Sequence, residues 1–209
     1  MRKIVKEGYE KGDYPGVFRR KGVPTEMEKR FLDLLLSQCP SDPRILDLGC
    51  GTGIPVDRYL AAQGAQITGL DISPKHIALA IATVPSALYI EADFSRIDLV
   101  DRTFDAVVSL YAIFHIPRQE HKALFAKIND LLKAKGVLLA TLGTSGSEYA
   151  EEADWTGAPM VWSTYEPKKY GELLVDAGFE LSETQFEGQP GDDECHFWVL
   201  ARKCRETGS

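Results

Sequence analysis

Apolar and polar positions along the chain predict one helix followed by an alternation of strands and helices. Met27, Phe31 and Leu35 recur at helical spacing, which is typical of an amphipathic helix. Thr25 and Glu28 have the spacing of a capping box, which predicts that this helix begins there. The predicted helices are 26–38, 54–63, 74–83, 117–133 and 167–177, and the predicted strands are 44–48, 66–70, 87–91, 104–110, 137–142, 179–186 and 195–201.

The alternation of strands and helices indicates the fold class. Strands separated by helices form a parallel sheet that is covered on both faces. The last two predicted strands are separated only by residues 187–194, a connection too short for a crossover helix, so they should pair as an antiparallel hairpin at the sheet edge. The sequence therefore predicts an α/β fold of the Rossmann-like, doubly wound kind, with a seven-stranded, mostly parallel sheet and an antiparallel terminal hairpin.

The length of 209 residues suits one such domain. Residues 1–24 show no clear periodicity, and residues 143–166 contain no clear element. Loops of that length in a compact domain are usually functional or disordered. We expect an N-terminal substrate-side segment (1–24), a domain over 25–203 with a lid insert at about 143–166, and a polar tail (204–209).

Composition narrows the possible partners. The net charge is −7, which repels phosphate backbones and disfavours nucleic acid. No apolar run is long enough to span a membrane, and the basic N-terminus has no apolar stretch typical of a secretory signal. The four cysteines lack CxxC spacing, so neither zinc nor another metal is expected. We expect a cytoplasmic monomer or homodimer with free thiols, in which the basic run 19–21 is solvated.

A glycine-rich turn follows the first predicted strand, in the segment Ile45-Leu46-Asp47-Leu48-Gly49-Cys50-Gly51-Thr52-Gly53. Glycine lets the backbone approach a ligand closely, and the following helix N-terminus offers unpaired N–H groups. Ligands of open α/β sheets bind beyond the carboxyl ends of the strands, where this turn lies. Dinucleotide-binding turns have the spacing G-x-G-x-x-G, whereas this chain reads G-x-G-x-G with Ile54 next. The spacing therefore disfavours a nicotinamide cofactor.

The octet Leu46–Gly53 closely resembles motif I of class I S-adenosylmethionine-dependent methyltransferases. Further stretches resemble that family in order and spacing, namely Gly69–Ser73, Glu91–Phe94, Phe104–Ser109 and Lys135–Leu139. The resemblance covers about residues 44–201, and an antiparallel last strand is also characteristic of the family. It implies S-adenosyl-L-methionine as the cofactor and S-adenosyl-L-homocysteine as the product.

The resemblance also implies roles for individual residues. In the family, the glycine turn packs against the methionine part and the ribose of S-adenosylmethionine. Asp47 matches an acid that helps to hold the ammonium group of this cofactor. The acid ending the second strand, here Asp71, binds the ribose hydroxyls, and the acid after the third strand, here Asp93, meets the adenine amino group. Simpler alternatives remain for all three, as ligands of loop N–H groups or as caps of the next helix or turn. The implied cofactor-binding residues are Asp47, Gly49, Cys50, Gly51, Gly53, Asp71, Ile72, Asp93, Phe94 and Leu110.

The candidate general base is His115, because it follows the fourth predicted strand and so lies at the carboxyl edge of the sheet. Imidazole titrates near neutral pH and suits an acceptor that must lose a proton. The alternative is that His115 caps the helix predicted from Pro117, or packs beneath the lid. Tyr111 and His196 are weaker candidates, and His121 is expected to be solvated.

Aromatic side chains concentrate in residues 1–24 and 143–166, the two segments that lack a strand or helix pattern. In the family such variable segments build the acceptor pocket. The aromatic side chains either line that pocket or pack the two segments against the rest of the domain. Residues 155–163 have the character of a lid. The implied substrate-contacting residues are Tyr14, Phe18, Tyr111, Trp155, Met160 and Trp162.

The predicted function is therefore methyl transfer from S-adenosylmethionine to a small-molecule acceptor, at an O, N or C atom. One alternative is a non-catalytic protein that binds S-adenosylmethionine, and another is an NAD(P)-dependent oxidoreductase. A methyltransferase acting on a protein or a nucleic acid is a further alternative. The low pI counts against nucleic acid, and no Asn-Pro-Pro-Tyr-like motif follows the fourth strand, where the chain reads Ser109-Leu110-Tyr111-Ala112, which disfavours methylation of the amino groups of bases or of glutamine.

Overall fold

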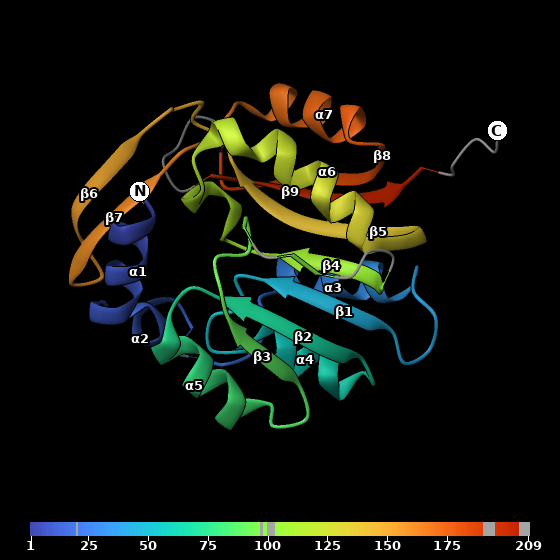
Figure 1. The fold of residues 1–209 in the computed structure, drawn as a ribbon, viewed down its shortest axis with the longest axis horizontal. Helices are drawn as coiled ribbons and strands as arrows, with labels where there is room; N and C mark the ends of the chain where they lie inside the picture. Colours follow the sequence, from blue (N-terminus) through green and yellow to red (C-terminus); the bar gives the residue numbers. More distant parts are fainter. Residues whose placement is uncertain (20, 97, 100–102, 190–194, 205–209) are drawn as a thin grey trace.

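The computed structural model describes residues 1–19, 21–96, 98–99, 103–189 and 195–204. Arg20 of the predicted basic run, much of the predicted 187–194 connection and residues 205–209 of the predicted tail lie outside this part of the chain. A central sheet dominates the fold, with its strands in the order β3-β2-β1-β4-β5-β9-β8 (Figure 1). The strands are β1 (Arg44–Leu48), β2 (Gln66–Asp71), β3 (Leu88–Glu91), β4 (Phe104–Ser109), β5 (Leu132–Gly143), β8 (Phe179–Glu187) and β9 (His196–Lys203).

The strand directions confirm the predicted fold class. The neighbours from β3 to β5 pair in parallel, whereas β9 is antiparallel to both β5 and β8. The terminal hairpin therefore closes one edge of the sheet, with β8 outermost and β9 inserted next to β5. The carboxyl ends of β1, β2 and β4 meet at one edge, which is where ligands of open α/β sheets bind.

Two layers of helices cover the sheet, and alternate strand residues face one layer or the other. Leu46 of β1 packs with Phe125 and Leu174 in the layer formed by α6 and α7. Its neighbour Ile45 packs with Phe31 in the opposite layer, formed by α3 and α4. The helices are α3 (Glu26–Leu36), α4 (Val56–Ala62), α5 (Pro74–Thr83), α6 (His121–Leu131) and α7 (Pro167–Asp176). In the described part of the chain, none of the helices has the length and apolar character to cross a membrane.

The helices predicted over 54–63 and 117–133 have different bounds in the structure. The helix predicted over 54–63 begins only at Val56, because the turn after the glycines continues through Pro55. The helix predicted over 117–133 begins as a 3-10 turn, continues as α6 and ends at Leu131. Leu132 instead starts β5 and pairs with Phe104 of β4, so the apolar pair at 131–132 is divided between a helix and a strand.

His121 is buried rather than solvated, which corrects the expectation for it. Its Nε2 lies 3.0 Å from the carbonyl oxygen of Ile116, and its ring stacks on Tyr170 of α7 at 5.7 Å. The position lies at the first turn of α6, and α7 covers it. Burial lowers the pKa of His121 to about 4.

The two segments without predicted elements form a second structural unit above the strand ends. Residues 1–24 contain α1 (Arg2–Lys11) and α2 (Tyr14–Phe18), and the insert folds as a hairpin of β6 (Ala150–Trp155) and β7 (Ala158–Trp162). The connection Thr156–Gly157 has φ values of 55° and 93°, as type I′ hairpin turns require. We call residues 1–19 and the β6–β7 hairpin the cap.

Within the cap, α1 lies directly against β7 (Figure 1). A Cβ atom at Gly8 would lie 2.7 Å from the carbonyl oxygen of Pro159, so only glycine permits this close approach. Val5 of α1, Met160 and Val161 of β7 form a small buried cluster between them. The cap therefore has an apolar centre of its own and is not a loose pair of loops.

Candidate functional site

The glycine-rich turn between β1 and α4 is shaped by Asp71 at the end of β2. The Gly51 N–H donates to Asp71 Oδ2 at 2.9 Å. Gly49 and Gly51 have φ values of 88° and 54°, a region that favours glycine. A Cβ atom at Gly49 would lie 2.3 Å from that of Ala112, whereas one at Gly51 would meet none of the described atoms within 4 Å. The turn is therefore packed from one side and open above Gly51.

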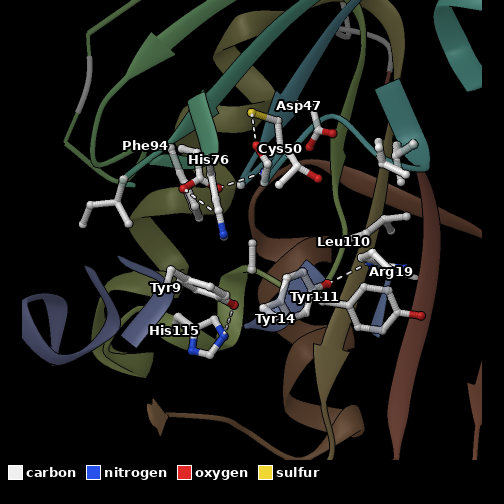
Figure 2. A pocket seen from close by; sticks show the side chains of 18 of the residues that line it. Tyr9, Tyr14, Arg19, Asp47, Cys50, His76, Phe94, Leu110, Tyr111 and His115 are labelled. Atoms are coloured by element: carbon white, nitrogen blue, oxygen red, sulfur yellow. Dashed lines mark hydrogen bonds and ion pairs between the residues drawn. The ribbon is translucent and has the colours of Figure 1, made fainter. Parts of the chain in front are cut away.

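A pocket lies above this turn, between the strand ends and the cap (Figure 2). From the body it is lined by the glycine turn, the ends of β2 and β4 and the first turn of α5. From the cap, the lining residues are Val5, Tyr9, Tyr14 and Arg19. The site is thus assembled from two units that lie far apart in the sequence.

Three carboxyl groups lie beneath and beside the turn. Asp71 also accepts the Ser73 N–H, at 2.9 Å. Asp47 and Asp57 are buried together, and Tyr89 donates its hydroxyl to Asp57 at 2.9 Å. Burial raises the pKa of Asp57 to about 6, and burial together with the nearby Asp57 raises the pKa of Asp47. Because two adjacent buried carboxylates repel each other, this pair binds a proton more readily than isolated carboxylates do.

Arg19 faces the same pocket and its side chain is only 13% exposed, so the expectation that this residue belongs to a solvated basic run was wrong. Its Nε donates to the Tyr14 hydroxyl at 2.9 Å, and its guanidinium forms an ion pair with the buried Glu28. Glu28 also accepts the Thr25 N–H, which confirms the predicted capping box. The guanidinium lies 4.9 Å from the centre of the Tyr111 ring. A positive charge is therefore held in the same pocket as Asp47.

A smaller pocket adjoins the first and contains Ile72, Asp93 and Phe94. Asp93 Oδ1 accepts hydrogen bonds from the backbone and hydroxyl of Ser95, at 3.1 and 2.7 Å. Its other oxygen forms an ion pair with Arg2 of α1, which also pairs with Glu120. Arg2, the first residue of α1, thus links this helix to the loop after β3.

His115 lies in the 3-10 turn after β4 (Ile113–His115) and contacts the cap through both ring nitrogens. Its Nδ1 is 2.8 Å from the carbonyl oxygen of Val161, which can only accept, so Nδ1 carries the hydrogen. Nε2 therefore has the lone pair, and the Tyr9 hydroxyl, 2.8 Å away, donates to it (Figure 2). Burial lowers the pKa of His115 to about 4. The ring is thus neutral at pH 7, with its basic nitrogen directed at Tyr9.

Comparison with known proteins fits this geometry. Residues 45–136 match the family model described as a methyltransferase domain. Phosphoethanolamine N-methyltransferase 3 of Arabidopsis thaliana is 31% identical over 180 residues, which cover 80% of this chain and 35% of that protein. This chain therefore spans about a third of the length of that curated relative.

Two solved structures share the fold. A S-adenosylmethionine-dependent methyltransferase from Methanosarcina mazei has a TM-score of 0.71 at 21% identity, covering 83% of this chain and 98% of that one. Magnesium protoporphyrin IX methyltransferase from Synechocystis PCC 6803, with S-adenosylmethionine bound, has a TM-score of 0.69 at 17% identity and covers 97% of this chain and 96% of that one. The chain carries a class I S-adenosylmethionine-dependent methyltransferase domain.

The methyltransferase domain brings most of the predicted cofactor-binding residues together. Those that line the larger pocket are Asp47, Gly49, Cys50, Gly51, Asp71, Ile72, Phe94 and Leu110. Asp93 lies in the smaller pocket beside it. Gly53 instead faces α5 and β3, where a Cβ atom would lie 2.9 Å from the Tyr89 hydroxyl. The alternative role of Asp71 as a helix cap does not hold, because the side chain that caps α5 is that of Ser73.

The predicted substrate-contacting residues divide into two groups. Tyr14 and Tyr111 line the pocket. Phe18, Trp155, Met160 and Trp162 lie behind that lining, within the cap. The Trp155 ring stacks on those of Tyr14 and Phe18, with ring centres 5.7 and 5.6 Å away, and the rings of Tyr14 and Phe18 are themselves 5.6 Å apart, so the three rings form a triangle. Contact of these four side chains with an acceptor remains a prediction.

Sequence reasoning assigned no role to several residues that line the pocket of the methyltransferase domain, among them the polar side chains of Tyr9, Arg19 and His76. Tyr9 reaches His115 across 106 positions of sequence, so no local pattern links them. Arg19 stood in a run of basic residues that reads as solvated. His76 carries the one usable signal, because it follows Asp71 by five residues and lies in the first turn of α5, at the same edge of the sheet.

Proposed function

We propose that this chain transfers a methyl group from S-adenosylmethionine to a small-molecule acceptor, with His115 as the base and Tyr9 between the base and the acceptor. One observation carries the proposal. A single pocket contains the glycine turn and Asp71 on one wall and the hydrogen-bonded pair Tyr9–His115 on another. A cofactor held on the first wall would present its reactive end to the second.

The residues present fit the cofactor. The open space above Gly51 admits a ligand directly onto the backbone. Each oxygen of Asp71 accepts one backbone N–H and keeps lone pairs for two further hydroxyl groups. Asp47 and Arg19 offer opposite charges to the ammonium and carboxylate groups of an amino acid. Asp93, together with the apolar side chains beside it, would hold the adenine.

When bound, S-adenosylmethionine supplies a methyl group on a positively charged sulfur, which needs no further activation. What remains for the protein is positioning and the removal of a proton from the acceptor. The Tyr9 hydroxyl takes that proton as it passes its own to Nε2 of His115. The carbonyl of Val161 and the charge of Asp71 both favour the resulting imidazolium, although burial opposes it more strongly. The base is therefore weak but always available near pH 7.

The acceptor class follows from the cap and the charge. The cap covers the pocket with aromatic side chains, as apolar small-molecule sites do. The net charge of −7 disfavours a nucleic acid acceptor. The Arabidopsis relative is named for phosphoethanolamine, which makes this amine the first acceptor to assay.

The decisive experiment compares melting temperatures with S-adenosylhomocysteine, with NADH and with neither. A ligand at about 100 times its dissociation constant adds about 2.7 kcal/mol to the free energy of unfolding, or roughly 5–10 °C. We expect a shift with S-adenosylhomocysteine alone, followed by acceptor-dependent formation of S-adenosylhomocysteine that is lost in His115→Ala. A chain that is stabilised only by NADH would contradict the proposal.

A further inference from the structure

His76 lies in the first turn of α5, and its side chain is turned into the pocket rather than toward solvent. The residue is only 1% exposed and lines the pocket. Its backbone N–H is capped by the Ser73 hydroxyl, so the backbone is satisfied. Figure 2 shows its ring above that of Tyr9, on the opposite side of Tyr9 from His115. The centres of the His76 and Tyr9 rings are 5.2 Å apart.

Neither ring nitrogen of His76 makes a hydrogen bond with any residue that the structure describes. The nearest carboxylate oxygen is Asp71 Oδ1, 3.7 Å from Nδ1, which is too long for a hydrogen bond. A buried polar group without a partner destabilises a protein, and an apolar side chain of similar size would fill the same space without that penalty. Packing against Tyr9 and Tyr14 therefore explains the shape of this side chain but not its polarity.

The neighbouring carboxylate indicates what would satisfy the ring. Asp71 only accepts hydrogen bonds, so a ligand group that binds to its remaining lone pairs must be a donor. A hydroxyl that donates to Asp71 still has lone pairs of its own and can accept an N–H from His76. An ammonium group has no such lone pair. The combination of a carboxylate and an imidazole side by side is therefore suited to a hydroxyl, and best to a vicinal diol.

We propose that His76 binds the ribose of the nucleoside cofactor, donating to a hydroxyl group that itself donates to Asp71. This inference rests on the proposed function, because the diol belongs to S-adenosylmethionine and its product. It assigns to the first turn of α5 a binding role that the glycine turn and Asp71 do not fill. It also explains why a histidine lies at a buried position where its ring nitrogens have no hydrogen-bond partner among the described residues.

Calorimetric binding of S-adenosylhomocysteine and of its 2′-deoxy and 3′-deoxy analogues tests the inference. The wild-type chain should bind each deoxy analogue about 10–100-fold more weakly than the parent compound. His76→Leu should bind the parent about 10-fold more weakly, and should lose most of the discrimination at one of the two hydroxyls. His76→Gln keeps a side-chain N–H and should stay within about 3-fold of wild type.

The melting temperature of the unliganded variants gives an independent readout. Removal of the unpartnered nitrogens in His76→Leu should raise it by roughly 2–4 °C, while the affinity for the ligand falls. Leu79→Gln, a half-exposed position on the same helix, is the matched control and should leave affinity unchanged.

Two results would overturn the inference. One is that His76→Leu binds the three ligands with the same ratios of affinity as the wild type. The other is that His76→Leu has a lower melting temperature than the wild type without ligand. Either leaves the proposed function intact. A wild-type chain that binds no S-adenosylhomocysteine overturns both.

Discussion

The body and the cap meet at one pocket, but they are held together by different interactions. The body buries a continuous apolar core on both faces of a parallel sheet, with Leu46 and Ile45 of one strand facing opposite layers. The cap has a small apolar centre around Val5 and Met160. Polar contacts link it to the body, such as the ion pair of Arg2 with Asp93 and the hydrogen bond of Tyr9 to His115, and ring contacts such as that of Tyr9 with His76 add to them.

The two units also differ in the proposed roles of most of their residues, although Arg19, which is proposed to bind the cofactor, belongs to the cap and His115 belongs to the body. The body supplies the glycine turn and Asp71, whose positions are fixed by the sheet. The cap supplies Tyr9 and the carbonyl group that orients His115. A unit with a small apolar core, held by side-chain contacts, opens more easily than a packed sheet, so ligand entry is expected to move the cap and to leave the strand ends in place.

The largest expected effect is a loss of turnover without a loss of cofactor affinity. Tyr9→Phe removes the hydroxyl that is proposed to relay a proton from the acceptor to His115, so turnover should fall about 100-fold or more while the affinity for S-adenosylhomocysteine stays within about 3-fold. Asp71→Asn should do the reverse and weaken that affinity. Initial rates with the acceptor found by assay, together with calorimetric affinities, measure both. Tyr14→Phe is the control for loss of a neighbouring phenol, and equal losses of affinity in Tyr9→Phe and Asp71→Asn would refute the division.

A matched pair of glycine substitutions compares how tightly the two units are packed. Gly49→Ala introduces a Cβ atom 2.3 Å from Ala112 at a φ of 88°, which should lower the free energy of unfolding by about 3 kcal/mol. Gly157→Ala, in the cap hairpin, has a similar φ of 93° but meets no described atom within 4 Å. Its loss should be only about 1 kcal/mol, from backbone strain. Denaturant titrations measure the free energy of unfolding of both variants. Equal losses would mean that the glycine turn accommodates a Cβ atom as easily as the hairpin does.

His121, one of the buried histidines of the body, predicts a dependence of the free energy of unfolding on pH. The pKa of His121 is about 4 in the folded chain, below its usual 6.5, so the unfolded state binds more protons between these values. Its contribution is complete above about pH 6.5 and is lost as the pH falls toward 4.

Unfolding titrations at pH 7 and pH 5 isolate this contribution. His121→Gln cannot titrate and should lose about 2 kcal/mol less between the two values than the wild type. Asp57, whose pKa is about 6, stabilises the folded state as the pH falls and so opposes the effect of His121. The difference between wild type and His121→Gln therefore isolates His121, whereas the wild-type curve alone does not. Parallel curves for both proteins would show that His121 titrates normally.

The smallest effect concerns the attachment of the cap. Arg2→Met removes partly buried ion pairs to Asp93 and Glu120, worth about 1 kcal/mol. Amide hydrogen exchange in α1 should then become roughly 5-fold faster, with no change in β1 or β4. Lys3→Met, which removes an exposed pair within the same helix, should leave exchange unchanged. Faster exchange throughout the sheet would show instead that the two units open together.

The parallel sheet was predictable because short apolar runs, β-branched residues and the glycine turn all indicate the same element in the same place. The cap was not. In α1, a glycine and several charged residues obscure the helical pattern, and β6 exposes most of its side chains. The hairpin turn Thr156–Gly157 lacks the asparagine or aspartate that usually marks such turns.

The candidate site divides in the same way. The glycine turn and Asp71 follow from a strand and the turn after it, so their convergence can be predicted from local sequence. The pair Tyr9–His115 and the partly buried ion pair of Arg19 with Glu28 depend on how separate segments pack. Nothing in the sequence around His121 shows that Tyr170 will cover it.

Helix α1 carries Arg2 at one end and Tyr9 toward the other, seven residues or about 10 Å along its axis. Arg2 reaches the carboxylate expected to meet adenine, and Tyr9 reaches the base expected to serve the acceptor. A rigid rod fixed at both subsites makes their occupancies interdependent, so each ligand changes the affinity of the other by the same factor. In a helix of this length, cooperativity between cofactor and acceptor would require no second subunit and no change in the sheet.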